Sequence, residues 1–89
     1  MARVVWTREA LANLELIRAY IEQFDPNAAV RLTAQLFAAG DSLRDFPRRG
    51  RPSGDGVREL PTVPPYVVQY EVHGDIAYIL RIKHGAQRR

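Results

Sequence analysis

The sequence predicts an α+β domain in which a helical hairpin covers one face of a small, mainly antiparallel sheet. The first observation is an alternation of apolar and polar residues in 66–73 and again in 76–84, the period of a half-buried strand. The second is an apolar stripe of helical spacing in residues 8–44, interrupted only at Asp25-Pro26. Because neither the stripe nor the sheet face can be buried alone, we expect them to pack together, in the order β-α-α-β-β-β.

Length and composition restrict the class of protein. The 89 residues are enough for one domain, which we place at 1–89, and 46% are hydrophobic, as in ordinary globular proteins. No apolar run approaches the ~20 residues of a membrane span, and no signal peptide opens the chain. The absence of cysteine excludes disulfides and thiol catalysis and disfavours structural zinc. We therefore expect a cytoplasmic protein without metal, cofactor or membrane partner.

The first half of the chain contains the predicted hairpin. Residues 3–6 form a short β-type run, and Thr7 lies where a helix N-cap is expected. Asp25 and Pro26 end the first helix and begin a second, predicted over residues 26–44. The first stripe comprises Leu11, Leu14, Ile17 and Ile21, extended by Ala10 and Phe24. The second comprises Ala29, Leu32, Leu36, Ala39 and Leu43, widened by Val30, Phe37 and Gly40.

The second half contains a loop and the remaining strands. Residues 46–56 are rich in Pro and Gly and show no period, which predicts a loop. It carries Arg48, Arg49 and Arg51. Residues 57–60 predict a short strand, the proline-rich residues 61–65 a stiff connection, and the tail 85–89 has no periodic signal.

The pattern also predicts how the last two strands pair around His73-Gly74-Asp75. An odd-numbered loop aligns both strongly apolar sets on one face, and Gly74 can supply the positive φ of a tight turn. We therefore expect an odd loop. The helix-facing set would be Tyr66, Val68, Tyr70 and Val72 with Ile76, Tyr78, Leu80 and Ile82. The outer face would carry Gln69, Glu71, Arg81 and Lys83.

The net charge of +3 lies in the second half. Residues 1–43 hold four Arg against five acids, and residues 44–89 hold nine Lys or Arg against five acids. Twelve of the thirteen basic residues are Arg, whose planar donor fork suits anionic or acidic partners. Scattered solubilising charges explain the same excess equally well.

Few residues could carry catalysis. No nucleophile, metal-binding or phosphate-loop motif occurs, and His73 is interpreted as a turn residue. His84 could act as a general acid or base, with Arg58 and Arg81 stabilising a phosphate. The alternative is a basic edge that only docks an acidic partner. Tyr66, Tyr70 and Tyr78 could stack on bases, although their spacing is also that of core residues.

With the order of elements in view, the sequence resembles the RelE/ParE superfamily of bacterial type II toxins. The resemblance covers nearly the whole chain in four segments. The segments are Val5-Trp6-Thr7 with the helix 10–21, Gly50-Arg51-Pro52 with Val57-Arg58-Glu59-Leu60, residues 66–72, and Ile79-x-Arg81-Ile82-x-His84-Gly85-Ala86-Gln87.

The resemblance implies the RelE/ParE-like fold and a toxin of a plasmid-stabilisation module that arrests growth. It implies a cognate antitoxin that wraps the toxin in a hetero-oligomer. RelE-like members cleave mRNA on the ribosome; Arg58 matches the strand arginine that these enzymes use, and His84 lies near their C-terminal catalytic region. If the chain is a ribonuclease, the candidate catalytic residues are Arg58, Arg81 and His84. However, Gly85 stands where some of these nucleases have a catalytic tyrosine, and the preceding loop has arginines instead of their lysines.

The segments look closer to ParE-like members, which poison DNA gyrase without being enzymes. We therefore expect a gyrase poison, with a ribosome-dependent endoribonuclease as the alternative and a degenerate, non-toxic binding module of the same fold as a second alternative. The residues expected to contact the target or the antitoxin are Arg48, Arg49, Arg51, Arg58, Arg81, Lys83 and His84.

Overall fold

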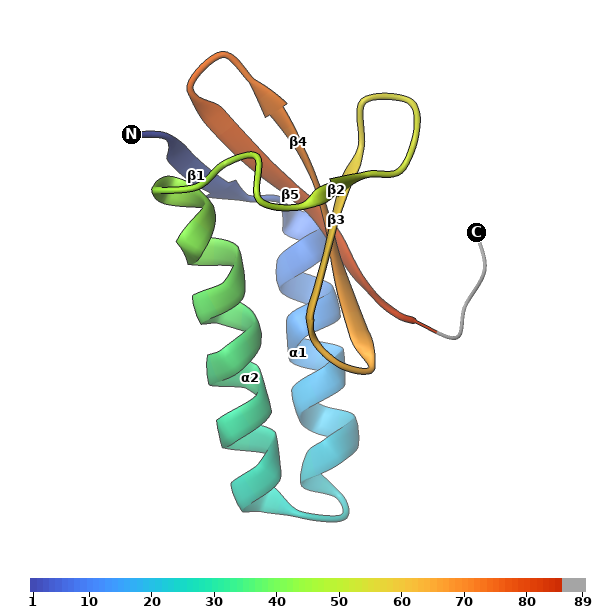
Figure 1. The fold of residues 1–89 in the computed structure, drawn as a ribbon. Helices are drawn as coiled ribbons and strands as arrows, with labels where there is room; N and C mark the ends of the chain where they lie inside the picture. The colour runs from blue at the N-terminus through green and yellow to red at the C-terminus, as the bar shows by residue number, and fades with distance from the viewer. Residues whose placement is uncertain (86–89) are drawn as a thin grey trace.

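A computed structural model describes residues 1–85, in which two helices lie on one face of a five-stranded sheet (Figure 1). The elements are β1 (Arg3–Trp6), α1 (Arg8–Glu22), α2 (Pro26–Asp41), a 3-10 turn (Ser42–Arg44), β2 (Arg51–Pro52), β3 (Arg58–Val63), β4 (Tyr66–His73) and β5 (Ile76–His84). The strand order is β1-β5-β4-β3-β2, and only the β1–β5 pair is parallel. The predicted α+β architecture is confirmed. Residues 86–89, which include Ala86 and Gln87 of the last motif, lie outside the described part.

One short strand was not predicted. Arg51 and Pro52, within the segment read as a loop, form β2 and pair with Glu59 and Arg58 of β3. A two-residue ladder at the edge of a sheet leaves no alternation to detect, and proline is tolerated there. No helix in the described chain has the length and apolar character needed to cross a membrane.

Both predicted helix caps are present. The Thr7 hydroxyl accepts a hydrogen bond from the Ala10 amide at 3.2 Å and donates to the Ile79 carbonyl of β5 at 2.7 Å. The Asp25 carboxylate accepts from the Ala28 amide at 3.1 Å, with Pro26 in the first turn of α2. The Thr7 cap therefore ends β1, begins α1 and fixes both to β5. The second helix is α-helical only to Asp41, because its predicted last turn, residues 42–44, is the 3-10 turn.

The core lies between the hairpin and the sheet, as predicted. Its buried members are Ala10, Leu36 and Leu43 from the helical layer and Leu60, Val68, Tyr70, Ala77, Ile79 and Ile82 from the sheet. The expected burial is wrong for Leu11, Phe24 and Val30, which are exposed, and Phe37 is exposed while stacking on Trp6. The hairpin projects past the sheet at its far end (Figure 1), so the sheet does not cover the whole of its apolar surface.

The predicted odd loop between β4 and β5 is wrong. His73 pairs with Ile76 across a two-residue turn, and Gly74 has a φ of 62°. Tyr70 pairs with Ile79 and Val68 with Ile82, so Leu80 is an extra residue that forms a β-bulge. The tight turn sets one register, and the bulge then shifts it by one residue.

The two-residue turn also changes the predicted faces of the first half of β5. Ala77 and Ile79 take the buried positions next to the turn, whereas Ile76, Tyr78 and Leu80, expected there, are only partly buried. Beyond the bulge the expected register holds. Ile82 is buried, and Arg81 pairs with Gln69 on the outer face, as predicted.

The position of the β-bulge predicts that truncating Ile79 and Leu80 will lower stability by different amounts. Ile79→Ala should lower the free energy of unfolding by about 2–5 kcal/mol, because it opens a cavity in a fully buried position. Leu80→Ala removes a side chain of equal size from the partly exposed bulge, so it should cost roughly half as much. Urea denaturation of both variants beside the parent measures the difference. Equal losses would contradict the observed register.

Candidate functional site

A buried hydrogen bond holds the arginine loop, residues 45–50, against the sheet. The Gly50 amide donates to the hydroxyl of Tyr70, which is fully buried at the centre of β4, at 2.8 Å. A Cβ at Gly50 would lie 2.6 Å from the same hydroxyl oxygen, closer than real side chains come. Position 50 therefore has to be glycine for the loop to come this close to the sheet.

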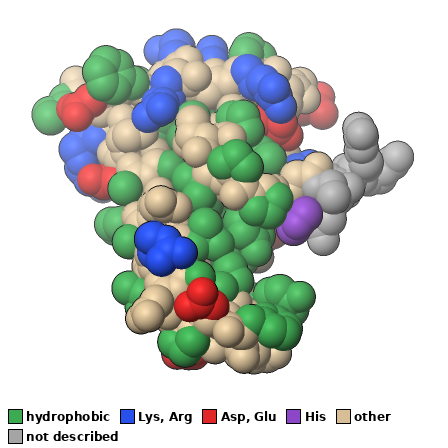
Figure 2. Space-filling model, turned by 60° about the horizontal axis from the view of Figure 1, so that its bottom comes forward, with side chains coloured by type: hydrophobic (Ala, Val, Ile, Leu, Met, Phe, Trp, Pro, Cys, Tyr) green, Lys and Arg blue, Asp and Glu red, His purple; other side chains and the backbone are tan. Residues whose placement is uncertain are grey.

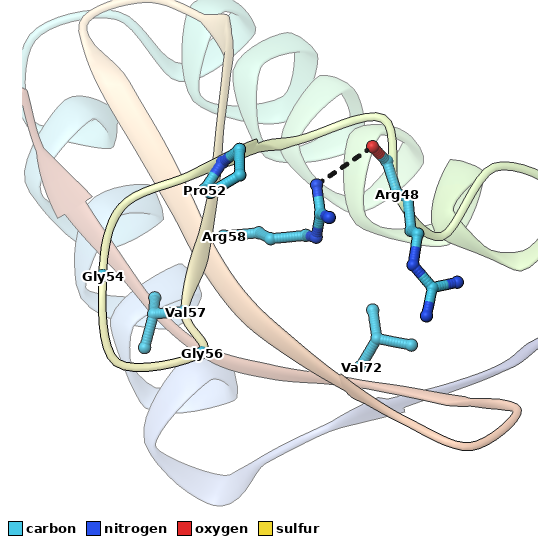
Figure 3. Close-up of a pocket in the computed structure, with 7 residues that line it drawn as sticks. All are labelled: Arg48, Pro52, Gly54, Gly56, Val57, Arg58 and Val72. Atoms are coloured by element: carbon cyan, nitrogen blue, oxygen red, sulfur yellow. Dashed lines mark hydrogen bonds between the residues drawn. The ribbon is translucent and has the colours of Figure 1, made fainter.

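Arg58 braces the same loop from β3. Its Nη1 donates to the carbonyl of Arg48 at 3.2 Å and to that of Gly50 at 2.6 Å (Figure 3). Arg58 pairs with Tyr70 across the sheet, so both side chains lie on the helix-facing side. The strand arginine predicted to contact a target is thus also a structural support of the loop.

A recess of about 310 Å³ lies between the loop and β3. It is lined by Arg48, Pro52, Gly54, Gly56, Val57, Arg58 and Val72. Figure 3 shows the Arg58 side chain extending across the recess toward Arg48, whose own guanidinium points toward Val72. No histidine or carboxylate is among the lining residues. The recess therefore brings two cations together against apolar walls.

Three other predicted cations, Arg51, Arg81 and Lys83, form a second group on the outer face, where each contacts an acid. Arg81 lies 3.4 Å from a Glu9 carboxylate oxygen and donates to the Gln69 amide oxygen at 2.8 Å. Glu59 lies between Lys83, at 4.0 Å, and Arg51, at 3.8 Å. Carboxylates of the chain itself therefore compensate this group. Arg49 belongs to neither group and donates to the Ser42 hydroxyl at 2.8 Å.

His84 occupies a third place. It ends β5 opposite Tyr66, and the two rings meet edge to face with centroids 5.6 Å apart. Both line a groove of about 250 Å³ between α1 and the ends of β4 and β5. Its other lining residues are Asn13, Leu16, Ile17, Ile82 and Lys83.

Arg58, Arg81 and His84 therefore do not converge. Arg58 pairs with Tyr70 of β4, and His84 pairs with Tyr66 of the same strand. Tyr66 and Tyr70 are four residues apart, so the two positions are separated by about 13 Å along the strand direction. Arg81 is level with Gln69 and so lies on the opposite face from Arg58. The predicted acid or base and the two predicted phosphate-binding cations occupy separate parts of the molecule.

An exposed apolar strip, which we define as Leu16, Tyr20 and Phe24, leads from this groove along α1. The three side chains are 67%, 60% and 71% exposed, and the rings of Tyr20 and Phe24 pack edge to face. Figure 2, turned to bring the hairpin end forward, shows apolar side chains gathered in a band that rises from that end. Sequence reasoning missed the strip, although Leu16 and Tyr20 lie four residues apart outside the buried stripe, a spacing that could have revealed it.

The outer polar face of α1 carries a different kind of charge cluster. Arg18 binds Glu15 through Nε and Nη2 and Glu22 through Nη1. The hydrogen bonds that Arg18 donates to Glu15 lower the pKa of that carboxyl, and the acceptance of hydrogen bonds by Glu15 and Glu22 raises the pKa of Arg18. All three groups are in water, so this cluster is a solvated helix face rather than a site.

Comparisons with known proteins agree with this architecture. Residues 4–89 match the family described as ParE toxin of the type II toxin-antitoxin system parDE. Toxin RelE2 of Caulobacter vibrioides is 51% identical over 87 residues, covering 98% of this chain and 99% of that protein. Toxin RelE1 of the same organism is 39% identical over 74 residues, covering 79% and 78%. A structure of the chromosomal ParDE system from P. aeruginosa matches with a TM-score of 0.84 and 29% identity, covering 94% and 96%.

The loop support can be tested through Tyr70. Tyr70→Phe should destabilise the protein by about 1–3 kcal/mol, because the Gly50 amide loses its buried acceptor. Amide exchange at Gly50 should accelerate more than exchange in α1. Tyr66→Phe is the matched control, since the Tyr66 hydroxyl makes no hydrogen bond to the part of the chain that the structure describes, and should change stability by less than about 0.5 kcal/mol. Unchanged Gly50 exchange in Tyr70→Phe would show that the hydroxyl does not hold the loop.

Proposed function

The chain belongs to the ParE toxin family of type II toxin-antitoxin systems, and from that premise we propose that its target is DNA gyrase. It is the toxin of such a module, and the module implies a cognate antitoxin as partner. In the proposed action the toxin holds gyrase on cleaved DNA without itself cutting nucleic acid. That action takes place in the bacterial cytoplasm, where gyrase and DNA are found.

The observation that carries the proposal is the separation of the acid or base from the cations. RNA cleavage needs a proton donor and acceptor close to the groups that stabilise the phosphate. Within residues 1–85, the recess with Arg48 and Arg58 has no titratable acid or base in its lining, and His84 is about 13 Å along the sheet from Arg58. This arrangement supports binding to a target more than chemistry on it.

The second candidate is a ribosome-dependent endoribonuclease. It is favoured by the names of two relatives, which are called RelE toxins. In that case Arg58, Arg81 and His84 would have to act on one phosphate. The separation on opposite faces of the sheet counts against this, as does the glycine that follows His84.

We further propose that the antitoxin binds along the apolar strip and into the groove beside His84. Leu16 belongs to both, so they form one continuous surface. Lys83 and His84 lie at the groove end, and the chain carries a net charge of +3. A partner segment with an apolar face and acidic flanks matches this surface in both shape and charge.

Two assays in parallel test the target. Purified toxin should convert gyrase and supercoiled DNA into cleaved complexes and leave mRNA on programmed ribosomes intact. His84→Ala should weaken toxicity only modestly, whereas Arg58→Glu should abolish it, because it reverses a charge in the recess and also removes the support of the loop. Circular dichroism must first show that both variants fold. Specific cuts in ribosome-bound mRNA that disappear in His84→Ala would establish the nuclease instead.

The antitoxin surface is tested with Leu16→Glu. Co-expression with the product of the neighbouring reading frame should give a complex, and its association rate should fall as salt rises. Leu16→Glu should weaken the complex by about tenfold or more, since an apolar contact becomes a charge facing an acidic segment. Val30→Glu changes an equally exposed apolar residue of α2 and should have little effect. Equal weakening by both variants would argue against the strip.

A further inference from the structure

The arginines of the recess differ from Arg51, Arg81 and Lys83 in making no ion pair within the described residues. Arg51, Arg81 and Lys83 each lie within 4.0 Å of Glu9 or Glu59. No ion pair of the described residues involves Arg48 or Arg58. Two guanidinium groups that lie near one another without a counter-charge repel each other. An anion that binds between them reduces this electrostatic repulsion. This charge imbalance distinguishes the recess from the outer face.

The hydrogen bonds of Arg58 leave one edge of its guanidinium available. Nη1 donates to the carbonyls of Arg48 and Gly50, whereas Nε and Nη2 make no hydrogen bond within residues 1–85. Nε and Nη2 form the edge through which arginine binds an oxyanion with two parallel hydrogen bonds. Arg18 uses the same edge to bind Glu15 on α1. Arg58 is therefore fixed by one nitrogen and open to a ligand through the other two.

We propose that this recess binds a phosphodiester group of a nucleic-acid strand, with Arg48 and Arg58 as its ligands. A planar carboxylate is satisfied by a single guanidinium edge, whereas a tetrahedral phosphate also presents oxygens to a second guanidinium on another element. Pro52, Val57 and Val72 line the rest of the recess and can contact the sugar beside the phosphate. The volume of about 310 Å³ leaves room for more than an isolated ion.

The inference deepens the proposed function and rests on it only for the choice of nucleic acid, which would be the DNA held by gyrase. Binding in the recess involves no bond cleavage, because no residue lining it can supply or remove a proton. A toxin with this recess can therefore contribute a contact to a phosphate of a protein–DNA complex without acting on it.

Direct binding tests the recess separately from toxicity. The full-length chain is titrated with the dinucleotide thymidylyl-thymidine, with inorganic phosphate and with a capped tetraglutamate peptide, followed by amide and arginine Nε NMR signals. The dinucleotide should shift the signals of Gly56, Val57 and the Arg58 Nε, and should bind more tightly than the peptide. Arg48→Ala should weaken it by about tenfold or more, since it removes a charged hydrogen bond while leaving the loop contacts in place.

Arg31→Ala is the matched control, because it removes the same charge from an exposed position on α2. It should alter dinucleotide affinity by less than about twofold; a general attraction to a basic protein would instead lower affinity equally in both variants. Equal losses, shifts scattered over the surface, or tighter binding of the peptide would overturn the phosphate assignment. If the parent protein binds the dinucleotide in the recess but does not poison gyrase, the proposed target is refuted and the recess assignment stands.

Discussion

The extra residue at Leu80 determines which way the last part of β5 faces. Had the register of the tight turn continued, Arg81 would pair with Val68 and point into the core, and Ile82 would point into water. The bulge instead pairs Ile82 with the buried Val68 and Arg81 with Gln69. One inserted residue therefore buries an isoleucine, exposes an arginine and separates Arg81 from Arg58. The division of the basic residues into two groups follows from it.

The recess depends in turn on a residue of the core. Tyr70 is fully buried, yet its hydroxyl reaches the Gly50 amide at the edge of the helical layer. A smaller core residue would fill less of the interior and leave that amide without a partner. Arg58 adds the two carbonyl contacts that fix the direction of the loop. The same interactions that close the core at this end thus hold Arg48 and Arg58 beside one another.

What the sequence could predict was local. The caps at Thr7 and Asp25 and the apolar stripes are set by residues within one or two turns, so the hairpin could be predicted in detail. The bulge could not, because alternation in β5 looks equally regular whether Leu80 points inward or is looped out. The pairing of Arg81 with Glu9 joins residues 72 positions apart, and Glu59 meets Lys83 only through the sheet register. The sequence showed which residues are basic, but only tertiary contacts decide which of them are already neutralised.

The two surfaces for which we propose partners lie at opposite ends of β4. Val72 lines the recess and Tyr66 lines the groove, six residues apart, or about 20 Å along the strand. A segment bound in the groove and along the apolar strip therefore does not reach Arg48 or Arg58 unless it continues across the sheet. If the antitoxin stops at the strip, it must neutralise the toxin by steric exclusion. It would then keep a large target, such as the proposed gyrase–DNA complex, away from the recess, while a small phosphate ligand still enters. If the antitoxin continues to the recess, it has to present an anion to the same two arginines. The dinucleotide would then compete only with the part of the antitoxin that occupies the recess. Because the two surfaces are far apart, dinucleotide binding by the toxin–antitoxin complex distinguishes the two modes of neutralisation.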